Sequence, residues 1–495
     1  MGIVQKQGLK IAAITFIGVL VGALNTMFVY PRVFGPEKHG LIIFILSIAT
    51  LITQFTHLGI PNVIIQFFPE LKNRKHFIYR ISTQLPLLSL AVFGVIFSLF
   101  SKKLFSEYSN QSDLFNEYQN LVIPLVALLV VFEIFNAISR AELKTVFPSF
   151  LKEFLIRAAT LILLGCYYFE YISFGDFMFY WLCSYATNVF LLAFYLVYNK
   201  FFKFSFGFPL VPNKLVGTRM INYGLVTLFT VSATILVNRV DLLMLAYFHE
   251  LEDVAFYSVA LYMATLIQIP ARSIMQIGKP LLAKAWNSDD RIEVQNLYSK
   301  SALNQMIFGS AVFVGIWLNI DDILYLVPIK YQGIKYVFLF LGLSKLIDTS
   351  CGLNGGVIVT SVKYKYDLYI NLILIVLTIG TNLLFIPYYG IEGAAFATSL
   401  SIISYNFIKW YLLKKCFEFN PFNLNYLKGL LLSFVIYAVV ALLPSVFDSA
   451  ICNIFLRSLI VCLLFVYLHY HFKISIDIYN LLYQLKNKIF LRSAN

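Results

Sequence analysis

The sequence predicts an all-α, polytopic membrane protein with about fourteen transmembrane helices. Two observations lead to this fold class. Hydrophobic residues make up 60% of the 495 residues and charged residues only 13%, whereas soluble domains carry about 25% charged residues. In addition, apolar runs of about 20 residues, long enough to cross a bilayer, recur from Lys10 to Phe472. Much of the surface must therefore face lipid.

The predicted spans follow one another along the chain as apolar runs separated by short polar loops. A first group lies at 10–30, 40–60, 78–100, 119–139, 150–169 and 174–198. A second group lies at 221–248, 254–274, 302–320, 336–360, 366–386 and 391–413, and two more spans lie at 428–446 and 452–472. The first run is too long for a signal peptide and lacks a small-residue cleavage site, so we interpret it as a retained span. The longest polar gaps, about 18 residues, are too short for a soluble domain.

Basic residues concentrate in alternate loops, which predicts the orientation of the chain. One set of loops carries most of them, including Lys72, Arg74, Lys75, Arg140, Lys144, Lys200, Lys203, Lys414 and Lys415. The opposite set carries little beyond Arg32, Lys38, Lys102, Lys103, Lys330 and Lys335. Lys and Arg near span ends are retained on the cytoplasmic side, so we expect a multi-pass membrane protein with both termini in the cytoplasm. The net charge of +13 is explained by this pattern and does not indicate nucleic-acid binding.

A basic stretch at 200–219 with Pro209 and Pro212 divides the spans into two halves, and we interpret it as a cytoplasmic linker. The predicted organisation is an N-terminal lobe at 1–199, the linker at 200–219, a C-terminal lobe at 220–415, accessory helices at 416–473 and an amphipathic cytoplasmic tail at 474–495. A weak repeat agrees with the two halves. Residues 34–52 can be laid against 248–267 with one gap, and both end in Ala-Thr-Leu-Ile. Repeated halves are typical of secondary transporters that bind substrate between the repeats.

The cysteines give no sign of a cofactor. All six lie in or beside apolar runs and lack the spacing of metal ligands. We therefore expect buried free thiols, with no disulfide, metal or other cofactor.

Three stretches resemble the polysaccharide flippase family of the multidrug/oligosaccharidyl-lipid/polysaccharide exporter superfamily. The first, 33–70, holds a Gly-Pro-Glu-x-x-Gly turn, an apolar span, Leu-Gly and Pro-Glu, formed here by Gly35, Pro36, Glu37, Gly40, Leu58, Gly59, Pro69 and Glu70. The second, 237–267, is similar to the start of the family's second half. It departs from the first copy, because Glu250, Glu252 and Asp253 stand there without Gly or Pro. The third, 389–399 (YGIEGAAFATS), is similar to the family's entry to span twelve.

The resemblance implies two six-helix lobes that form a V around a central cavity, with spans thirteen and fourteen as accessory helices. It also implies a transporter and not an enzyme, with a lipid-linked glycan as cargo. The partners we expect are the lipid-linked oligosaccharide, membrane lipids, H⁺ or Na⁺ as the coupling ion, and polysaccharide polymerase machinery.

Ionisable side chains inside spans are the candidate site residues, because each costs about 2.5 to 3.5 kcal/mol at a span centre unless it has a partner or a wet cavity. Arg239 and Asp241 lie in span seven, where a spacing of two points them to different faces. Structural bridges between helices and a cavity role both remain open for this pair. Lys345 and Asp348 in span ten have the spacing of a pair on one face. Either they neutralise each other or they face the cavity.

Further candidates are polar groups in other spans. The sequence after Asp348, Cys-Gly-Leu-Asn-Gly-Gly, is poor in helix formers and favours a break in span ten that offers backbone groups to a ligand. Glu133, one turn before Asn136, either carries a coupling proton or bonds its neighbours. Glu153 and Arg157 at the start of span five are spaced i,i+4, and we expect an ion pair between them. Asn25 is a candidate for substrate binding, although interhelical hydrogen bonds are the usual role of such a residue. Arg32, beside the outer turn, either snorkels or guards the mouth of the cavity.

The function predicted from these features is a flippase that moves a polyprenyl-diphosphate-linked oligosaccharide to the outer leaflet by alternating access, for O-antigen, capsule or exopolysaccharide synthesis. Arg239 and Lys345 are the cations expected to hold its diphosphate. A peptidoglycan-precursor flippase of the same superfamily is the nearest alternative. An ion-coupled exporter of cationic drugs fits less well, because the buried charges are balanced or basic. A membrane glycan polymerase fits least, because the chain lacks a large outer loop and a cluster of carboxylates.

Overall fold

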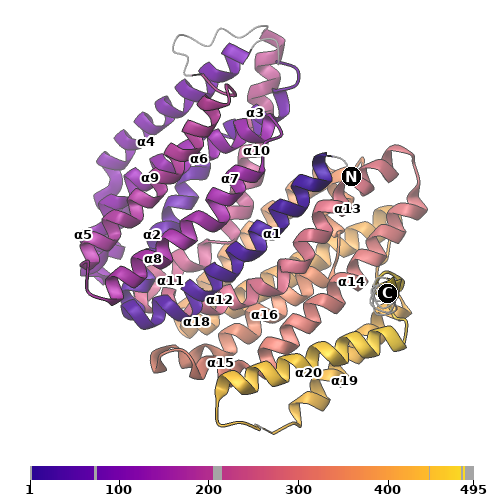
Figure 1. Ribbon diagram of the computed structural model, residues 1–495. Helices are drawn as coiled ribbons and strands as arrows, with labels where there is room; N and C mark the ends of the chain where they lie inside the picture. The colour runs from indigo at the N-terminus through magenta and orange to yellow at the C-terminus, as the bar shows by residue number, and fades with distance from the viewer. Residues whose placement is uncertain (1–2, 72–74, 204–213, 445, 481–482, 485–495) are drawn as a thin grey trace, which may run out of the picture. The chain divides into compact units, whose positions relative to one another are not determined.

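The computed structural model describes the chain except residues 1–2, 72–74, 204–213, 445, 481–482 and 485–495. All regular secondary structure in the described residues is helical, which confirms the all-α prediction (Figure 1). The chain divides into two compact units, Met1–Ser258 and Val259–Asn495.

Among the described residues, the first unit holds fourteen helical segments and the start of another. They are α1 (Ile3–Ala23), η1 (Leu24–Val29), α2 (Tyr30–Thr56), α3 (Ile60–Phe67), α4 (Lys75–Gln111), α5 (Asp113–Tyr118), η3 (Gln119–Leu121), α6 (Val122–Ala141), α7 (Val146–Phe150), η4 (Leu151–Leu155), α8 (Ile156–Tyr168), α9 (Phe174–Tyr198), α10 (Lys214–Val237) and α11 (Val240–Phe248), followed by α12 (Leu251–Thr265), in which the unit ends.

The second unit continues from α12 to the C-terminal accessory helices. Its segments are η5 (Leu266–Gln268), α13 (Ile269–Asn287), α14 (Arg291–Leu318), α15 (Ile320–Tyr325), η6 (Ile329–Ile334), α16 (Lys335–Ser350), α17 (Asn354–Thr360), α18 (Lys365–Phe417), α19 (Leu424–Ala441) and α20 (Ala450–His471).

Ten helices among the described residues are long and apolar enough to cross a membrane, or eleven if a bent pair is counted as one span. Two of these stretches, Ala13–Thr56 and Lys365–Phe417, each cover two predicted spans. Both contain a glycine with positive φ, Gly35 at 72° and Gly390 at 53°. At Gly35 the positive φ forms the turn of the Gly-Pro-Glu motif. Residues with a side chain rarely adopt this backbone conformation, so the turn favours glycine. The count of fourteen stays a prediction, in part because span five is divided among α7, η4 and α8.

The predicted linker and tail lie largely outside the described residues. The division between the compact units falls after Ser258, in α12, and so later than the linker proposed at 200–219. The domain boundaries proposed from the sequence therefore stay predictions.

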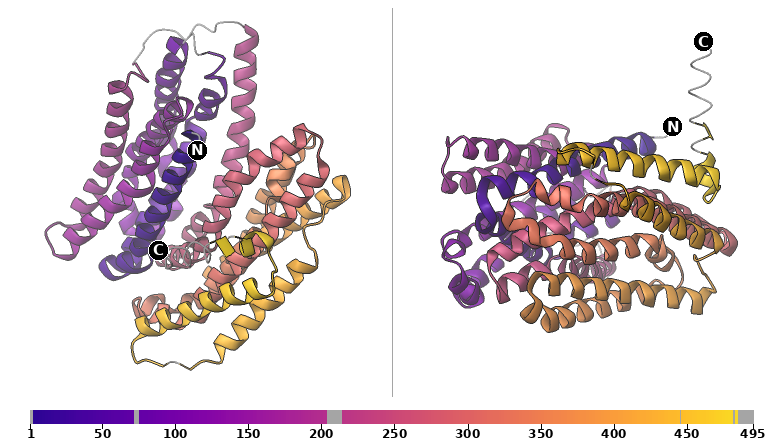
Figure 2. Two further views of the ribbon diagram at one scale, coloured as in Figure 1. Left: turned by 45° about the vertical axis from the view of Figure 1, so that its right-hand side comes forward. Right: turned by 90° about the horizontal axis from the view of Figure 1, so that it is seen from below.

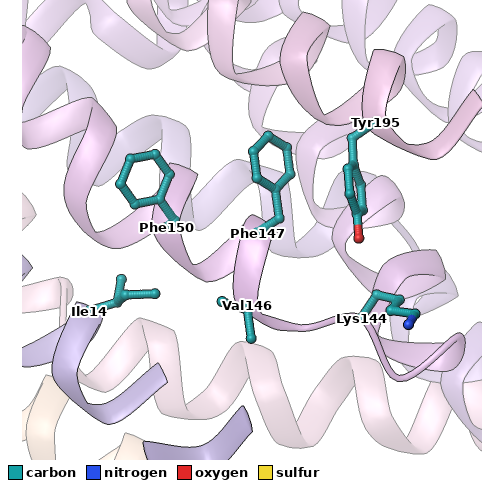
Figure 3. Close-up of a pocket in the computed structure, with 6 residues that line it drawn as sticks. All are labelled: Ile14, Lys144, Val146, Phe147, Phe150 and Tyr195. Atoms are coloured by element: carbon teal, nitrogen blue, oxygen red, sulfur yellow. The ribbon is translucent and has the colours of Figure 1, made fainter. Parts of the chain in front are cut away.

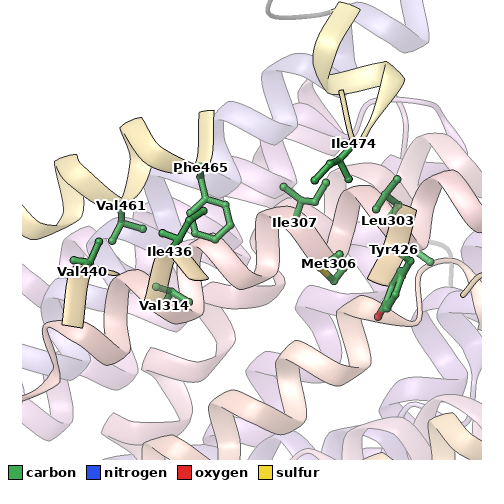
Figure 4. Packing of buried hydrophobic residues seen from close by; sticks show 11 residues of the cluster. Leu303, Met306, Ile307, Val314, Tyr426, Ile436, Val440, Val461, Phe465 and Ile474 are labelled. Atoms are coloured by element: carbon green, nitrogen blue, oxygen red, sulfur yellow. The ribbon is translucent and has the colours of Figure 1, made fainter. Parts of the chain in front are cut away.

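Each unit has its own packed interior. In the first, α2 and α9 pack against α6, and α8 packs against α9. In the second, α19 and α20, the predicted accessory helices, lie against α14 and against each other (Figure 2). Their shared core is aliphatic except for two aromatic side chains, and Figure 4 shows its members Leu303, Met306, Ile307, Val314, Tyr426, Ile436, Val440, Val461, Phe465 and Ile474. This burial attaches the accessory helices to the second unit.

Candidate functional site

Arg239 lies at a break in predicted span seven. Helix α10 ends at Val237, α11 begins at Val240, and Arg239 between them has φ −127° and ψ −18°. The predicted span at 221–248 is therefore divided between two helices. The half-buried guanidinium of Arg239 donates from Nη1 to Oγ of the fully buried Ser47 in α2 over 3.4 Å. A neutral hydroxyl leaves the positive charge of Arg239 without compensation from Ser47.

Asp241, in the first turn of α11, is buried and takes a different partner. The Tyr257 hydroxyl in α12 donates to its Oδ2 over 2.7 Å. Asp241 thus links α11 to α12 within the first unit. This bond supports the interhelical reading of Asp241 that the sequence left open.

A second polar position in the first unit joins the π-helical segment η1 to the start of α8. Asn25 lies in the π-helical segment η1, and its Nδ2 donates over 2.9 Å to the backbone carbonyl of Arg157. Just before Arg157 runs a second π-helical segment, η4. The wider π-helical turn is rare and recurs at functional sites, because it displaces side chains from their regular positions. Asn25 therefore bonds between helices, as predicted, at an irregular part of the backbone.

Arg157 keeps hydrogen-bonding capacity that its ion pair does not use. Its Nη2 lies 3.2 Å from Oε2 of Glu153, which confirms the predicted i,i+4 pair. Its Nη1 is buried without a hydrogen-bond partner among the described residues, and so is Oδ1 of Asn25. Buried polar atoms of native proteins are nearly always bonded, so such atoms need an explanation. The sequence interpretation stopped at the ion pair and missed this.

Tyr185 in α9 lies near enough to both Arg157 and Arg239 for each guanidinium charge to act on its hydroxyl. We call Asn25, Arg157, Tyr185 and Arg239 the arginine cluster. It brings two guanidinium groups to one region of the first unit. Residues from four segments of the chain form it, which sequence spacing alone does not reveal.

Glu133 and Arg32 lie elsewhere in the first unit. The carboxylate of Glu133 in α6 is 2.5 Å from the exposed ammonium of Lys152, and Asn136 donates to it over 3.3 Å. The neighbour contact expected from the sequence is therefore present, and the coupling role stays a prediction. Arg32 is exposed at the start of α2. Glu70 of the Pro-Glu motif accepts two hydrogen bonds from Arg219 over 3.3 and 3.4 Å.

The second unit contains the break expected in span ten. Helices α16 and α17 meet at an angle of 46°, and Gly352 between them has φ +63°. A side chain on Gly352 would collide with the backbone of Ala302, so the position requires glycine. The break is thus fixed by backbone conformation and by packing.

Asp348, one turn before the break, is held by two amides from other segments. Nε2 of Gln268 donates to Oδ2 over 2.9 Å, and Nδ2 of Asn406 donates to Oδ1 over 2.9 Å. Lys345 is buried on the same helix. The carboxylate of Asp348 therefore ties η5 and α18 to α16, a role that the i,i+3 spacing with Lys345 did not predict.

A buried ion pair lies one turn further along α18. The ammonium of Lys409 is 3.3 Å from Oδ1 of Asp367, with side-chain exposures of only 6% and 16%. Lys409 also donates to the Tyr405 hydroxyl. The sequence interpretation left these three residues out, because Lys409 and Asp367 lie near predicted span ends. The spacing of Tyr405 and Lys409 by one helical turn was the available signal.

A pocket of about 320 Å³ lies in the first unit, apart from the candidate residues. Its lining, shown in Figure 3, is Ile14, Lys144, Val146, Phe147, Phe150 and Tyr195. Lys144 is the one charged group in this lining, so the pocket is mainly apolar. In the described part of the chain, no cluster of His, Cys, Asp and Glu has a geometry suited to a metal ion.

The family of the chain follows from its sequence. The model of a family described as "Polysaccharide biosynthesis protein" matches residues 6–286, more than half of the chain. The chain belongs to this family. Among curated proteins, no sequence match is found. The family match covers the arginine cluster and all of the first unit that follows residue 5.

Solved structures share the fold of this family member. The inward closed conformation of the lipid II flippase MurJ is 15% identical, with a TM-score of 0.72 over 94% of this chain and 99% of that one. An inward-facing multidrug resistance MATE family transporter of the MOP superfamily is 13% identical, with a TM-score of 0.64 over 83% and 98%. A Pyrococcus furiosus MOP superfamily transporter, described as having a binding pocket of reverse polarity, is 14% identical, with a TM-score of 0.56 over 83% and 96%. The fold is therefore that of MOP superfamily transporters.

Proposed function

We propose that this protein is a flippase that carries a polyprenyl-diphosphate-linked oligosaccharide from the cytoplasmic to the outer leaflet of the bacterial plasma membrane. The cargo would serve the synthesis of O-antigen, capsule or exopolysaccharide. The family description, polysaccharide biosynthesis, supports a glycan cargo. A transporter of the MOP type needs a site for the part of this cargo that lipid cannot solvate, which is the diphosphate with its sugars.

The observation that carries the proposal is the unused guanidinium nitrogen of Arg157 beside a second arginine. Nη1 of Arg157 is buried without a hydrogen-bond partner among the described residues, and Arg239 shares the neighbourhood of Tyr185. A guanidinium remains charged when buried and binds two phosphate oxygens at once, so a diphosphate fits two such groups. A cationic drug would be repelled by them.

The remaining candidate residues have supporting roles in this proposal. Asn25 offers its unpartnered Oδ1 to a sugar hydroxyl. Lys345, buried in the second unit, stays a candidate substrate-binding cation, and Arg32 is a basic residue at the outer end of the path. Alternating access would expose these groups to one side of the membrane at a time. H⁺ or Na⁺ would drive the cycle, and the polysaccharide polymerase machinery would take the cargo outside.

The test is transport of a defined cargo by the purified protein in liposomes. Lipid-linked oligosaccharide is placed in one leaflet, and its arrival in the other is measured by access of an added glycosidase. We expect accessible cargo to rise with time only in vesicles that contain the protein. The same assay with a peptidoglycan precursor tests the alternative of the same superfamily. Transport of that lipid without transport of the oligosaccharide would overturn the assignment of the cargo.

A further inference from the structure

The pocket of the first unit has an apolar end and a polar end. Figure 3 shows Phe147 between Phe150 and Tyr195. The ammonium of Lys144 and the hydroxyl of Tyr195 lie toward one end, and the Ile14 side chain lies toward the other. The ring of Phe147 is 4.6 Å from that of Tyr195, so α7 and α9 share a wall of the pocket. A ligand of this pocket of about 320 Å³ therefore needs an apolar part and a polar part.

The lining residues lie near the ends of four predicted spans, on the side predicted to face the cytoplasm. Ile14 is only about 6 Å inside the first span, and Tyr195 is about 5 Å from the end of the sixth. Phe150 begins the fifth span, and Lys144 follows the fourth. This depth is that of lipid headgroups and of the first carbons of acyl chains.

Lys144 is held at the polar end by the turn that follows α6. The N–H of Leu143, whose φ is +58°, donates to the carbonyl of Arg140 over 3.0 Å. The N–H of Lys144 donates to the carbonyl of Ser139 over 2.8 Å, and the buried Ser139 hydroxyl donates to the carbonyl of Lys144. The two backbone bonds are those of a Schellman motif, a common end of a helix. The backbone of Lys144 is thus fixed, while its exposed ammonium forms no ion pair or hydrogen bond with the described residues.

Helix α9 ends beside α6 and brings a second cation to the same region. The ring of Phe202, just after α9, lies 5.5 Å from the ring of Phe135 in α6. Lys200, with φ +59°, forms the turn that ends α9 and is exposed. It follows Tyr195 of the pocket by little more than one helical turn.

Positive charge outweighs negative charge around this polar end. Arg140 and Lys203 are exposed there in addition to Lys144 and Lys200. The turn between α6 and α7 and the end of α9 contain one acidic residue, Glu142. Basic pockets between spans at a cytoplasmic surface favour anionic lipid headgroups. Charge and depth therefore select the same class of ligand.

We propose that this pocket binds an anionic phospholipid of the leaflet predicted to face the cytoplasm, with its phosphate at Lys144 and an acyl chain against Phe147 and Phe150. The ammonium carries three N–H donors and the Tyr195 hydroxyl carries one O–H donor, which suits the oxygens of a phosphate. The cationic group of a zwitterionic lipid would be repelled by the surrounding lysines. A single lining cation fits one phosphate, whereas the diphosphate of the proposed cargo fits the two guanidiniums of the arginine cluster. Binding of the phospholipid does not rest on the proposed flippase function.

Photo-crosslinking with phosphatidylglycerol that carries a diazirine near the start of one acyl chain tests the site directly. The purified full chain is placed in phosphatidylcholine nanodiscs with a small fraction of this probe, irradiated and mapped by peptide mass spectrometry. We expect label on residues 146–150 and at Tyr195, at least about fivefold above the label from phosphatidylcholine with the same diazirine chain. Equal labelling by the two probes would show that only bulk lipid fills the pocket and would overturn the proposal.

Three variants test whether Lys144 holds the headgroup. Lys144→Ala should lower the phosphatidylglycerol label in the pocket by about fivefold, since one cation near the membrane surface contributes about that much. Lys144→Arg keeps the charge and should keep the label. Lys414→Ala is the matched control, because Lys414 is an exposed lysine in the last turn of α18, in the other unit. Full label in Lys144→Ala, or an equal loss in Lys414→Ala, would overturn the assignment to Lys144.

Competition separates the phospholipid from the cargo as the occupant. Polyprenyl phosphate is added to the nanodiscs in an amount equal to the phosphatidylglycerol probe. We expect the label on residues 146–150 to persist, because the pocket is proposed to hold the phospholipid. Complete loss of this label would assign the pocket to the polyprenyl chain and overturn the proposal, while the proposed flippase function would remain.

Discussion

The arginine cluster of the first unit and the hydrogen bonds around Asp348 in the second differ in how their buried polar atoms are bonded. The arginine cluster holds buried atoms of Arg157 and Asn25 that have no hydrogen-bond partner among the described residues. Around Asp348 the network is closed, since each carboxylate oxygen meets an amide donor. An unmet buried donor costs about 1 to 3 kcal/mol, so it persists where a ligand supplies the missing bond. A closed network instead holds one conformation.

We therefore propose that the arginine cluster binds the cargo and that the network around Asp348 holds the conformation of its unit. If this is correct, variants of the arginine cluster lose cargo binding and keep the stability of the wild type. Variants of the Asp348 network lose stability and keep cargo binding. The following predictions test the division, beginning with the largest expected effect.

Arg239→Ala should reduce transport per folded molecule by about tenfold to 100-fold, because a hydrogen bond to a charged group contributes about 1.5 to 3 kcal/mol. Arg239→Lys should lose less, since the charge remains while the two-pronged geometry is lost. The measurement is cargo transport in liposomes, divided by the amount of folded protein. Arg219→Ala is the control, because Arg219 lies on the neighbouring helix α10, is exposed and bonds to Glu70. Normal transport per folded Arg239→Ala molecule would leave Arg239 with a structural role only.

Lys409→Ala should affect stability and not cargo affinity. The substitution leaves Asp367 buried without its ion-pair partner, which typically costs about 3 to 5 kcal/mol. Thermal unfolding of the purified variant should therefore begin at a clearly lower temperature than in wild type. The double variant Asp367→Asn, Lys409→Met should recover most of the loss, since it removes both charges.

Lys414→Ala serves as the control for Lys409. Lys414 is exposed on the same helix, and its ammonium lies 5.2 Å from the centre of the Trp410 ring. An exposed contact of this kind contributes about 0.5 to 1 kcal/mol. Equal losses in Lys414→Ala and Lys409→Ala would show that burial of the ion pair is unimportant.

Arg157 and Arg239 should act on the same group of the cargo. Arg157→Ala alone should weaken binding of the lipid-linked oligosaccharide by about tenfold, equal to about 1.4 kcal/mol. If both guanidiniums hold one diphosphate, the loss in the double variant will differ from the sum of the single losses by at least about 0.5 kcal/mol. Binding measured with all four proteins completes this cycle. Strict additivity would separate Arg157 from the site of Arg239.

The sequence predicted the fold class well, because long apolar runs report the membrane environment directly. The family resemblance placed the turn at Gly35, and the glycine-rich stretch after Asp348 placed the break near Gly352, since glycine limits helix formation. The sequence did not predict the break at Arg239, whose surroundings Val237-Asn238-Arg239-Val240 contain neither Gly nor Pro. A break of this kind depends on tertiary contacts, such as the bond from Arg239 to Ser47.

Contacts between different helices were the second feature that the sequence predicted poorly. Spacing along one helix correctly predicted the pair of Glu153 with Arg157, because such partners lie one turn apart. The contacts of Asp348 with Gln268 and Asn406 join residues 80 and 58 positions apart. The periodicity of residues along a helix does not indicate contacts between residues so far apart in the sequence. The Lys409–Asp367 pair was missed for the same reason, although each residue was visible as a charge near a span end.

The smallest effect is expected for Glu133, for which the sequence left a coupling role open. Its carboxylate already pairs with Lys152, whose side chain is 51% exposed. Pairs that reach solvent contribute at most about 1 kcal/mol, so Glu133→Gln should unfold at nearly the wild-type temperature. Its dependence on the proton gradient should also persist, because Lys152 stabilises the ionised form. Transport is measured with and without a pH gradient in Glu133→Gln and wild type side by side. If the gradient loses its effect in Glu133→Gln, Glu133 carries the coupling proton, and its contact with Lys152 is more than a structural pair.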